Sequence, residues 1–325
     1  MGAEWKLNDV NYTTISDFLF AGFPGLILVP ELLGVTFILT YFLTLLANIF
    51  IFYVIRKHET LHTPMFIIIC NLAVSDVIYS TVISPKIIQT YLFGNRTIKI
   101  HLCLVQMYFL HFAGSVDSFI LLVMAVDRYV SVCHPLRYST LITNTVAQRM
   151  CSAAWVLGAA NPLLIVSYAS LLPYCGPNKI SHLYCEYGLV VRLACTDTTF
   201  HLQMGISVGC LVLLCPFLLI LLSYLKIIIS VLKITTVSGR MKATYTCSTQ
   251  LIVITIYFLP RVFVYIAFTA GFSLQGDLRI ALGIIYCLLP PILNPVIYSF
   301  RLKEIKQVMF KILKHKDITL LPSSS

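Results

Sequence analysis

The chain has 325 residues, of which 58% are hydrophobic and 11% are charged. A soluble domain carries about a quarter charged residues, so this chain cannot cover a water-facing surface and must expose much of its exterior to lipid. The formal net charge of +10 would suit a nucleic-acid partner. No basic stretch interleaved with aromatic residues is present to follow a phosphate backbone, however, and we expect no such partner.

Seven apolar runs are long enough to cross a membrane, which takes about 20 predominantly apolar residues per helix. In chain order they are Leu28–Ile55, Pro64–Gln89, Leu102–Val132, Val146–Tyr168, Phe200–Leu232, Ala243–Ala270 and Leu278–Phe300. Glycine, proline and polar residues inside such runs are tolerated where neighbouring helices satisfy the freed backbone groups. The sequence predicts an all-α membrane protein with a seven-transmembrane helix bundle over residues 28–300, flanked by residues 1–27 and 301–325.

The placement of lysine and arginine predicts the orientation of this bundle. The side reached after the first, third, fifth and seventh runs holds Arg56, Lys57, Arg128, Arg137, Arg149, Lys226, Lys233, Arg240, Lys242, Arg301, Lys303, Lys306, Lys311, Lys314 and Lys316. The other side holds Lys6, Arg96, Lys99, Lys179, Arg192 and Arg279. The positive-inside rule assigns the richer side to the cytoplasm, so we expect residues 1–27 outside the cell and residues 301–325 inside.

Two acceptor triplets for N-glycosylation, at Asn11 and Asn95, fall on the predicted outer side. The opening segment Met1–Asp17 is polar and has neither a basic n-region nor an apolar h-region. We therefore expect no cleavable signal peptide, and we expect the first span to direct its own insertion. Both observations agree with the orientation that the basic residues predict.

Cysteine usage differs between the two sides. Eleven cysteines cannot all pair within one chain. Seven lie in the runs or on the predicted cytoplasmic side, where packing is the expected role: Cys70, Cys133, Cys151, Cys210, Cys215, Cys247 and Cys287. The four on the oxidising side are Cys103, Cys175, Cys185 and Cys195, which permit three pairings and suggest a stapled loop. Zinc is the alternative, but no Cys-x2-Cys or His-x3-His spacing accompanies them.

Ionisable residues inside the runs are the strongest functional signals, because a charge in hydrocarbon is costly. They are Asp76, Asp117, Asp127, Arg128, Arg261 and, near an outer end, Lys86. An enzyme would need clustered metal ligands or a nucleophile with its base, and a transporter would show repeated halves or polar stripes along several helices. Neither pattern is present, so we expect no enzymatic activity, and a transporter is the weaker alternative.

Five segments carry motifs in an order typical of one family. They are Leu61–Phe66 (LHTPMF), Asn71–Asp76 (NLAVSD), Met124–Tyr138 (MAVDRYVSVCHPLRY), Lys242–Cys247 (KATYTC) and Pro290–Tyr298 (PPILNPVIY). Together they resemble the rhodopsin-like (class A) G-protein-coupled receptors and, within them, the odorant receptors. The third and fourth segments favour an odorant receptor over a non-olfactory rhodopsin-like receptor. Gly22–Leu26 and the Pro290-Pro291 pair are similar to the fish-like branch of odorant receptors.

The resemblance implies a multi-pass plasma-membrane receptor that binds a small-molecule odorant. It implies activation of a heterotrimeric G protein of the stimulatory, olfactory type, which raises cAMP. It also implies the disulfides Cys103–Cys185 and Cys175–Cys195, and an activation switch at Asp127, Arg128, Tyr129, Asn294, Pro295 and Tyr298. In that switch Arg128 has a charged partner until activation releases it; a snorkelling arginine at a helix end is the alternative.

A cation site is expected between two acidic residues. Asp117 lies ten residues before Asp127, close to three helical turns, and so faces the same interior as Asp76. Asn48 and Asn294 match further polar positions of the family. Two unpaired carboxylates in a low-dielectric interior repel, so either a cation bridges them or one is protonated. The resemblance implies sodium, with a neutral hydrogen-bonded pair as the alternative, and no other cofactor is expected. Aspartate here is shorter than the family's usual glutamate.

The resemblance places the ligand between the outer halves of the third, fifth, sixth and seventh runs. Helical spacing from Cys103 sets His111, Ser115 and Ser118 along one side of the third run, with Leu110 and Gly114 alongside. Phe258 is a further candidate contact on the sixth run. His111 is either a ligand contact or a hydrogen-bonded interior residue. Leu110 stands where amine receptors of the superfamily carry aspartate, which disfavours an amine ligand.

Arg261 is peculiar to this chain. It follows Pro260, the expected kink of the sixth run, so its guanidinium is expected to face the pocket. We hypothesise that it binds an anionic ligand such as a carboxylate or a sulfate. The alternative is a structural partner, at Asp277, Glu186 or backbone carbonyls.

The segment Arg301–His315 is basic and has apolar residues at helical spacing. These are Leu302, Ile305, Val308, Met309, Ile312 and Leu313. The pattern predicts an amphipathic helix on the inner leaflet, with membrane lipid as its partner. A solvated tail is the alternative.

Overall fold

The computed structural model describes residues 15–23, 30–272, 276–308 and 310–311. In this part of the chain seven helical spans are long and apolar enough to cross a membrane, which confirms the predicted bundle. They are α1 (Pro30–Lys57), α2 (Pro64–Leu92), α3 (Ile100–Cys133), α5 (Asn144–Ser170), the continuous span of α7 (Thr199–Gly209), η3 (Cys210–Leu214) and α8 (Cys215–Leu232), α9 (Val237–Thr269) and α10 (Gly276–Arg301).

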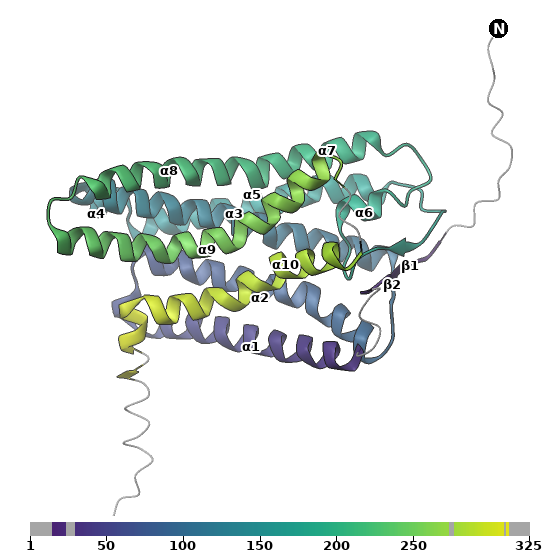
Figure 1. Ribbon diagram of the computed structural model, residues 1–325, viewed down its shortest axis with the longest axis horizontal. Helices are drawn as coiled ribbons and strands as arrows, with labels where there is room; N and C mark the ends of the chain where they lie inside the picture. The colour runs from purple at the N-terminus through teal and green to yellow at the C-terminus, as the bar shows by residue number, and fades with distance from the viewer. Residues whose placement is uncertain (1–14, 24–29, 273–275, 309, 312–325) are drawn as a thin grey trace, which may run out of the picture.

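Short elements connect these spans. They are η1 (Glu59–Leu61), η2 (Pro135–Arg137), α4 (Tyr138–Leu141), α6 (Tyr187–Val191), β1 (Asp17–Phe20), β2 (Thr97–Lys99) and β3 (Lys179–Ile180). In Figure 1, β1 and β2 lie at one end of the bundle, called the sheet end below, and α4 lies at the other, called the α4 end. The sheet end is the one predicted to face outward.

Local sequence explains where several helices begin. Pro64 occupies the first turn of α2, where its missing N–H leaves no hydrogen bond unmade. The Thr143 side chain caps α5 by accepting a hydrogen bond from the backbone N–H of Val146. Both signals are visible in the sequence, and both helices begin within two residues of the predicted runs.

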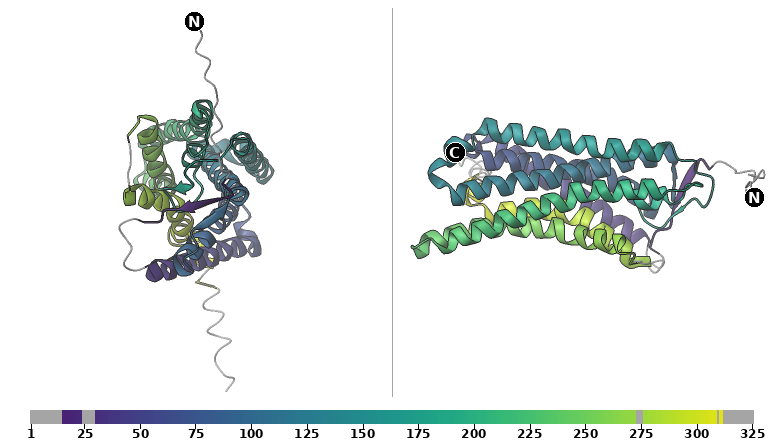
Figure 2. Two further views of the ribbon diagram at one scale, coloured as in Figure 1. Left: turned by 90° about the vertical axis from the view of Figure 1, so that its right-hand side faces the viewer. Right: turned by 90° about the horizontal axis from the view of Figure 1, so that it is seen from above.

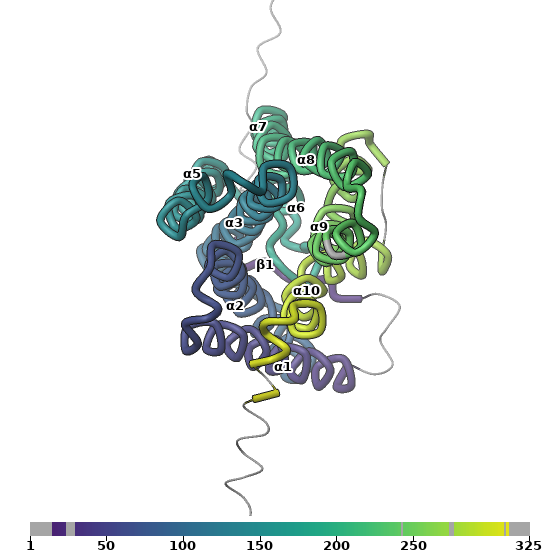
Figure 3. Tube along the Cα trace, turned by 90° about the vertical axis from the view of Figure 1, so that its left-hand side faces the viewer, coloured from purple at the N-terminus to yellow at the C-terminus, as the bar shows by residue number. Residues whose placement is uncertain are grey.

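Helix α3 supplies much of the interior. It packs on α2, α5, α8 and α9, and the view along the bundle shows α5 outside it and α1 beside α2 and α10 (Figure 3). Gly158 of α5 permits a close approach to α3, because a Cβ there would lie 2.5 Å from Cγ2 of Val116. Side chains along α3 can therefore face the centre of the bundle.

A three-stranded sheet, which the sequence did not predict, crosses the sheet end (Figure 2). Strand β1 pairs antiparallel with β2 and parallel with β3. Phe18 and Phe20 are fully buried beneath it, and the Phe18 ring meets Tyr174 edge-on at 5.3 Å between centroids. The sheet ties the segment before α1 to the loop between α5 and α6.

Two disulfides hold that loop over the bundle. Cys103 of α3 is bonded to Cys185, and Cys175 is bonded to Cys195. These are the pairings that the resemblance implied. With both bonds in place, the residues that follow Cys185 are fixed against the end of α3.

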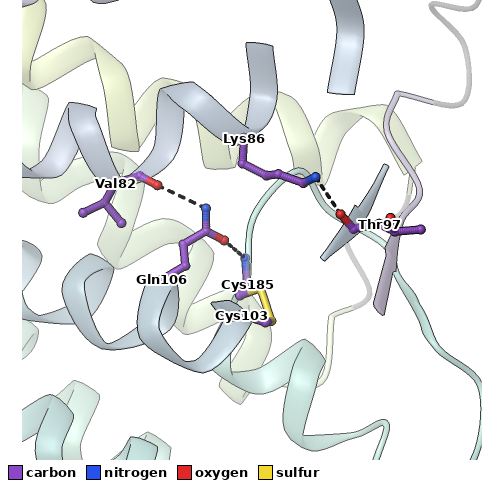
Figure 4. Close-up of a disulfide and its surroundings, with 6 residues drawn as sticks. All are labelled: Val82, Lys86, Thr97, Cys103, Gln106 and Cys185. Atoms are coloured by element: carbon purple, nitrogen blue, oxygen red, sulfur yellow. Dashed lines mark hydrogen bonds between the residues drawn. A yellow bond between two sulfur atoms is a disulfide. The ribbon is translucent and has the colours of Figure 1, made fainter. Parts of the chain in front are cut away.

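Side chains of α2 and α3 reinforce this attachment (Figure 4). Gln106 accepts a hydrogen bond from the backbone N–H of Cys185 at 3.0 Å and donates one to the carbonyl of Val82 at 3.1 Å. Lys86 donates to the carbonyls of Asn95 and Thr97 at 3.1 and 2.6 Å. The charge predicted near the outer end of the second run thus fixes the loop before β2.

After α10 the chain turns into a short helical stretch at residues 303–308. Leu302, Ile305 and Val308 are buried in the core of the bundle, whereas Lys303 and Lys306 are exposed. The stretch is amphipathic as predicted, but over these residues its apolar face packs on the bundle and not on the leaflet. Of the predicted apolar positions, Met309, Ile312 and Leu313 lie outside the described residues.

Candidate ligand-binding site

A cavity of about 240 Å³ lies between the helices and the disulfide-bonded loop. Its walls come from α2, α3, α5, α6, α7, η3, α9 and α10, and Tyr184 and Glu186 of the loop border it. Five of the six predicted ligand contacts line it: His111, Gly114, Ser115, Ser118 and Arg261. The structure therefore brings α3 and α9 together around one space, as the sequence predicted.

Arg261 carries a positive charge into this cavity. Its Nη1 donates to the carbonyl of Tyr257, one turn earlier on α9, at 3.0 Å. The guanidinium carbon lies 3.8, 5.4 and 5.6 Å from the ring centroids of Tyr257, Tyr286 and Tyr79. Its Nη2 is buried and has no hydrogen-bond partner among the described residues. A backbone carbonyl, one of the predicted structural partners, thus occupies only one of the two terminal nitrogens.

The three tyrosines around Arg261, called the tyrosine cage below, were not identified from the sequence. Ring faces attract a guanidinium by about 0.5–2 kcal/mol each. Ring faces do not replace a hydrogen-bond acceptor, however. A buried donor that lacks an acceptor lowers the free energy of unfolding by about 1–3 kcal/mol. Tyr257, four residues before Arg261, could have been found by helical spacing. Tyr79 and Tyr286 come from other helices, and no local pattern connects them to it.

His111 presents a second unsatisfied group to the same cavity. Its Nε2 is buried without a hydrogen-bond partner among the described residues, and its ring meets Tyr187 edge-on at 6.4 Å. Ser118, by contrast, donates its hydroxyl to the carbonyl of Val212 at 2.6 Å. That carbonyl belongs to η3, a single π-helical turn, and such turns frequently occur at functional sites. Ser118 therefore supports the cavity wall, while His111 keeps a nitrogen free.

The structure places Phe258, the sixth predicted ligand contact, outside the cavity lining. Its side chain is fully buried and packs between Phe217 and Tyr257 at centroid distances of 5.3 and 4.8 Å, and it is not among the residues that line the cavity. One residue along a helix rotates the side chain by about 100°. Tyr257 faces the cavity, and its neighbour consequently faces the core.

The loop over the cavity carries buried titratable groups of its own. Burial raises the pKa of Glu186 above its ordinary value, and the nearby guanidiniums of Arg279 and Arg192 oppose that rise. Burial, assisted by Arg279, lowers the pKa of His182 to about 3. The His182 ring packs on Tyr184 at 4.1 Å between centroids. It can lie there because α10 has glycine at position 283, where a Cβ would be 2.4 Å from its Nε2.

Polar side chains also gather at the centre of the bundle. Asn294 donates to Asp76 Oδ2 at 2.9 Å, and Asn48 donates to the carbonyl of Pro291 at 2.9 Å. The Oδ1 atoms of Asn48, Asp76, Asp117 and Asn294 are buried and have no hydrogen-bond partner in the described parts of the chain. Asp76 and Asp117 interact electrostatically with each other, and Arg261 acts on both. If both carboxylates are ionised, they and the Arg261 guanidinium together carry one net negative charge, which a cation would neutralise.

The chemistry of these oxygens fits a hard cation. Carboxylate and amide oxygens are the ligands that such ions prefer. Across the described residues, no cluster of three or more His, Cys, Asp or Glu side chains gathers as a zinc-type site would require. The residues present therefore fit sodium better than a transition metal, although Arg261 supplies part of the compensating charge.

Comparison with known proteins identifies the family. The family described as "Olfactory receptor" matches residues 37–316. The chain belongs to the olfactory receptor family. Olfactory receptor 6N1 of Homo sapiens is 38% identical over 308 residues, which cover 95% of this chain and 98% of that relative. Olfactory receptor 10D3 of Mus musculus is 37% identical over 308 residues, which cover 94% and 97%. The receptor is thus a multi-pass plasma-membrane protein and not an enzyme; its place in the fish-like branch stays a prediction.

In this olfactory receptor Arg128 does not pair with its neighbour as the resemblance implied. Asp127 accepts a hydrogen bond from the hydroxyl of Tyr138 at 2.8 Å. Arg128 Nε donates to Gln250 Oε1 of α9 at 3.4 Å, and its Nη2 contacts Met65 Sδ at 2.9 Å. No ion pair joins Asp127 and Arg128 within the described ranges. The loop after α3 thus holds the Asp127 carboxylate through Tyr138, and the Arg128 side chain is directed to α9.

Gln250 therefore joins three helices at the α4 end of the receptor. Its Oε1 accepts the hydrogen bond from Arg128 of α3 and a second one from the hydroxyl of Tyr224 of α8 at 3.3 Å. Its side chain is 3% exposed, so water does not replace these bonds. We call this arrangement the Gln250 clasp. The clasp was not predicted from the sequence, because a glutamine near the end of an apolar run is not conspicuous.

The remaining predicted switch residues lie close to the clasp or on α10. Tyr129 packs its ring against His134 at 5.7 Å between centroids. The Tyr298 hydroxyl points to Met124 Sδ at 3.9 Å, which brings α10 against α3. Pro295 lies inside α10, next to Asn294. These positions agree with a switch that connects the centre of the bundle to its α4 end, and the switch itself stays a prediction.

The two predicted glycosylation sites differ in what the structure describes. Asn95 is exposed at the sheet end, and its Oδ1 accepts hydrogen bonds from the backbone N–H and hydroxyl of Thr97 at 3.2 and 3.0 Å. Asn11 lies outside the described residues. Exposure at this end is what glycosylation of Asn95 requires, and the modification stays a prediction.

The depressed pKa of His182 predicts a pH-dependent stability. Below its ordinary value of 6.5 the unfolded chain binds a proton that the folded loop excludes, so stability falls as pH falls from about 6.5 towards 3. We expect a loss of up to about 1.4 kcal/mol per pH unit from this group. Thermal unfolding of the purified receptor between pH 7.5 and 5 should show a flatter pH dependence for His182→Gln than for the unaltered chain.

Glu186 acts in the opposite direction, because a carboxyl with a raised pKa loses stability as pH rises. Because Glu186 is present in both the unaltered receptor and His182→Gln, comparing the two proteins at each pH cancels the contribution of Glu186 and isolates that of His182. Parallel curves for the two proteins would contradict the placement of a neutral histidine in the loop.

Proposed function

We propose that this olfactory receptor binds a small anionic odorant in the cavity beside Arg261 and activates a stimulatory, olfactory-type G protein that raises cAMP. The observation that carries the ligand class is the buried Nη2 of Arg261, which has no hydrogen-bond partner in the described chain. Arginine stays protonated in proteins. An acceptor that arrives with a negative charge is therefore the partner that the group lacks.

The surroundings of Arg261 favour a ligand over a permanent internal partner. His111 Nε2 is also unsatisfied and lines the same cavity. A carboxylate has two oxygens and can accept hydrogen bonds from two donors at once. One oxygen would bind Arg261 Nη2, and the second would bind the His111 ring in its Nε2-protonated tautomer. Both nitrogens would then be satisfied by one small molecule.

The cavity volume supports a small ligand. Drug-sized ligands occupy pockets of about 300–1,000 Å³, whereas this cavity measures about 240 Å³. The tyrosine cage and the apolar side chains of α3, α5 and η3 provide the remaining contacts. A short-chain or aromatic carboxylic acid fits these limits, and a peptide does not.

We propose that sodium binds between Asp76 and Asp117. The unpartnered Oδ1 atoms of these residues and of Asn294 support it. Sodium would supply the positive charge that lets both carboxylates stay ionised in a low-dielectric interior. The neutral, hydrogen-bonded pair is the alternative, and Arg261 lowers the need for a cation by acting on both acids.

We further propose that the Gln250 clasp restrains the receptor before activation. G-protein coupling requires access to the α4 end, which is the predicted cytoplasmic face. The clasp joins α3, α8 and α9 there through two hydrogen bonds to one amide oxygen. Because the amide is neutral, this restraint is weaker than the ion pair that the resemblance implied.

Replacement of Arg261 tests the ligand class. We expect Arg261→Met to raise the half-maximal concentration of a carboxylic odorant about 10- to 100-fold, because a hydrogen bond to a charged group contributes about 1.5–3 kcal/mol. The response to the methyl ester of the same acid should change less than threefold. The measurement is cAMP accumulation in cells that carry an olfactory-type G protein.

Arg96→Met is the matched control, since Arg96 is an exposed arginine near the sheet. Equal losses for the acid and its ester would mean that Arg261 holds the fold and not the ligand. An unchanged response to acids would refute the anionic ligand directly.

Exchange of sodium for a large organic cation tests the ion site. We expect the melting temperature of the purified receptor to be higher in sodium chloride than in N-methylglucamine chloride at equal ionic strength, because an ion that binds only the folded state stabilises it. Asp117→Asn should abolish this difference, since the amide carries no charge. A sodium effect that persists in Asp117→Asn would place the ion elsewhere.

Changes at Gln250 test the clasp. We expect Gln250→Leu to raise ligand-independent cAMP several-fold at equal surface expression, because α9 loses its polar contacts with α3 and α8. Gln250→Glu should lower basal cAMP, since it gives Arg128 a charged partner. If both variants shift basal signalling in the same direction, the clasp does not restrain the receptor.

A further inference from the structure

A groove on the outside of the bundle lies between α1, α10 and the helical stretch at residues 303–308, and its cavity volume of about 310 Å³ exceeds that of the ligand cavity. We call it the α1–α10 groove. Phe50 of α1, Val296 and Phe300 of α10 and Phe310 border it. It is separate from the ligand cavity and shares no lining residue with it.

The walls of the groove face lipid. Phe50 is 39% exposed, Val296 42%, Phe310 61% and Phe300 72%. Large apolar side chains this exposed on membrane helices are expected to meet hydrocarbon, because transfer to water would be unfavourable. A groove between such side chains is open to an acyl chain or another apolar molecule from the bilayer.

Lys306 gives this groove a preference among lipids. It is the one charged residue among the described lining residues, and its ammonium lies 5.9 Å from the ring centroid of Phe310. No carboxylate pairs with it in the described part of the chain. Ile305 before it and Val308 after it are buried in the core, so the lysine is held at the groove by a stretch that is anchored on both sides.

The charge around Lys306 is predominantly positive. Arg301, Lys303 and Lys311 lie within five residues of it, against one acid, Glu304. Lys303 and Lys311 are exposed. An anionic membrane surface attracts basic residues that lie close to it. The groove thus combines apolar walls with the ammonium of Lys306, in a predominantly basic segment, which matches a phospholipid with a negative headgroup.

We infer that the α1–α10 groove binds an acyl chain of an anionic phospholipid, whose phosphate pairs with the ammonium of Lys306. A zwitterionic phospholipid offers the same chains and the same phosphate, but its choline cation is repelled by the basic cluster. A sterol offers only a hydroxyl group, which leaves the charge of Lys306 without an anion.

The position of the groove connects this lipid to α10. Pro295 lines the groove, and its neighbour Asn294 donates a hydrogen bond to Asp76 at 2.9 Å on the interior side of the helix. A lipid that fills the groove supports the outer face of α10 at the level of this bond. Anionic lipid is therefore expected to stabilise the folded receptor as well as to bind it.

Native mass spectrometry of the full-length receptor tests the inference. Purified receptor is incubated in detergent with equal amounts of phosphatidylserine and phosphatidylcholine that carry identical chains. We expect the unaltered chain to retain phosphatidylserine preferentially. Lys306→Gln should reduce phosphatidylserine retention at least fivefold and leave phosphatidylcholine retention unchanged, whereas Lys306→Arg should preserve both.

Lys233→Gln is the matched control, because Lys233 is an exposed lysine at the same end of the bundle, on the C-cap of α8. Ala47→Trp fills the groove from α1 and should displace phosphatidylserine while the Lys306 charge is retained. Equal effects of Lys306→Gln and Lys233→Gln would overturn the site, as would displacement of bound phosphatidylserine by cholesterol. These readings need no odorant or G protein, so their outcome is independent of the proposed function.

Discussion

A guanidinium buried among apolar helices is the constraint on which the proposed ligand chemistry depends. Arg261 cannot lose its proton, and it lies far from either end of α9. The receptor compensates its charge in three partial ways: one backbone carbonyl, three tyrosine rings, and the electrostatic influence of Asp76 and Asp117. None of these occupies Nη2, and the proposed anion in the cavity would supply the missing acceptor.

The same charge links the ligand cavity to the polar centre of the bundle. If both are ionised, Asp76 and Asp117 repel each other unless positive charge lies nearby. Arg261 provides part of that positive charge. An anionic odorant that pairs with Arg261 would reduce the positive charge that acts on the two acids. By thermodynamic linkage, binding at one position must then change cation affinity at the other. The hydrogen bond from Asn294 to Asp76 extends this coupling to α10.

The seven spans and the grouping of site residues on α3 and α9 could be predicted because both depend on local properties. Apolar length defines a span, and helical spacing sets His111, Gly114 and Ser115 on one side. The β-sheet could not be predicted, since strands of two to four residues pair across long stretches of chain. The tyrosine cage and the Gln250 clasp were missed for the same reason: each joins side chains from different helices.

Two side chains lie elsewhere than the sequence suggested. Phe258 was assigned to the pocket although the next step around the helix turns it into the core. The family resemblance implied a charged partner for Arg128, beside Asp127 in the sequence, yet adjacent residues on a helix point in different directions. Tyr138, beyond the end of α3, instead reaches the carboxylate. Sequence neighbours are a poor guide to partners wherever a helix end meets a folded loop.

The most direct test of the account is the distance between a bound acid and Arg261. A carboxylic odorant labelled with ¹³C at the carboxyl carbon, bound to receptor with ¹⁵N-labelled arginine, allows that distance to be measured by solid-state NMR, with Arg261→Met identifying the signal. A direct hydrogen bond of about 2.8 Å, accepted along a carboxylate lone pair, predicts a carbon–nitrogen distance of about 3.6 Å. A bound acid whose carboxyl carbon shows no arginine coupling, or a coupling that survives in Arg261→Met, would contradict it.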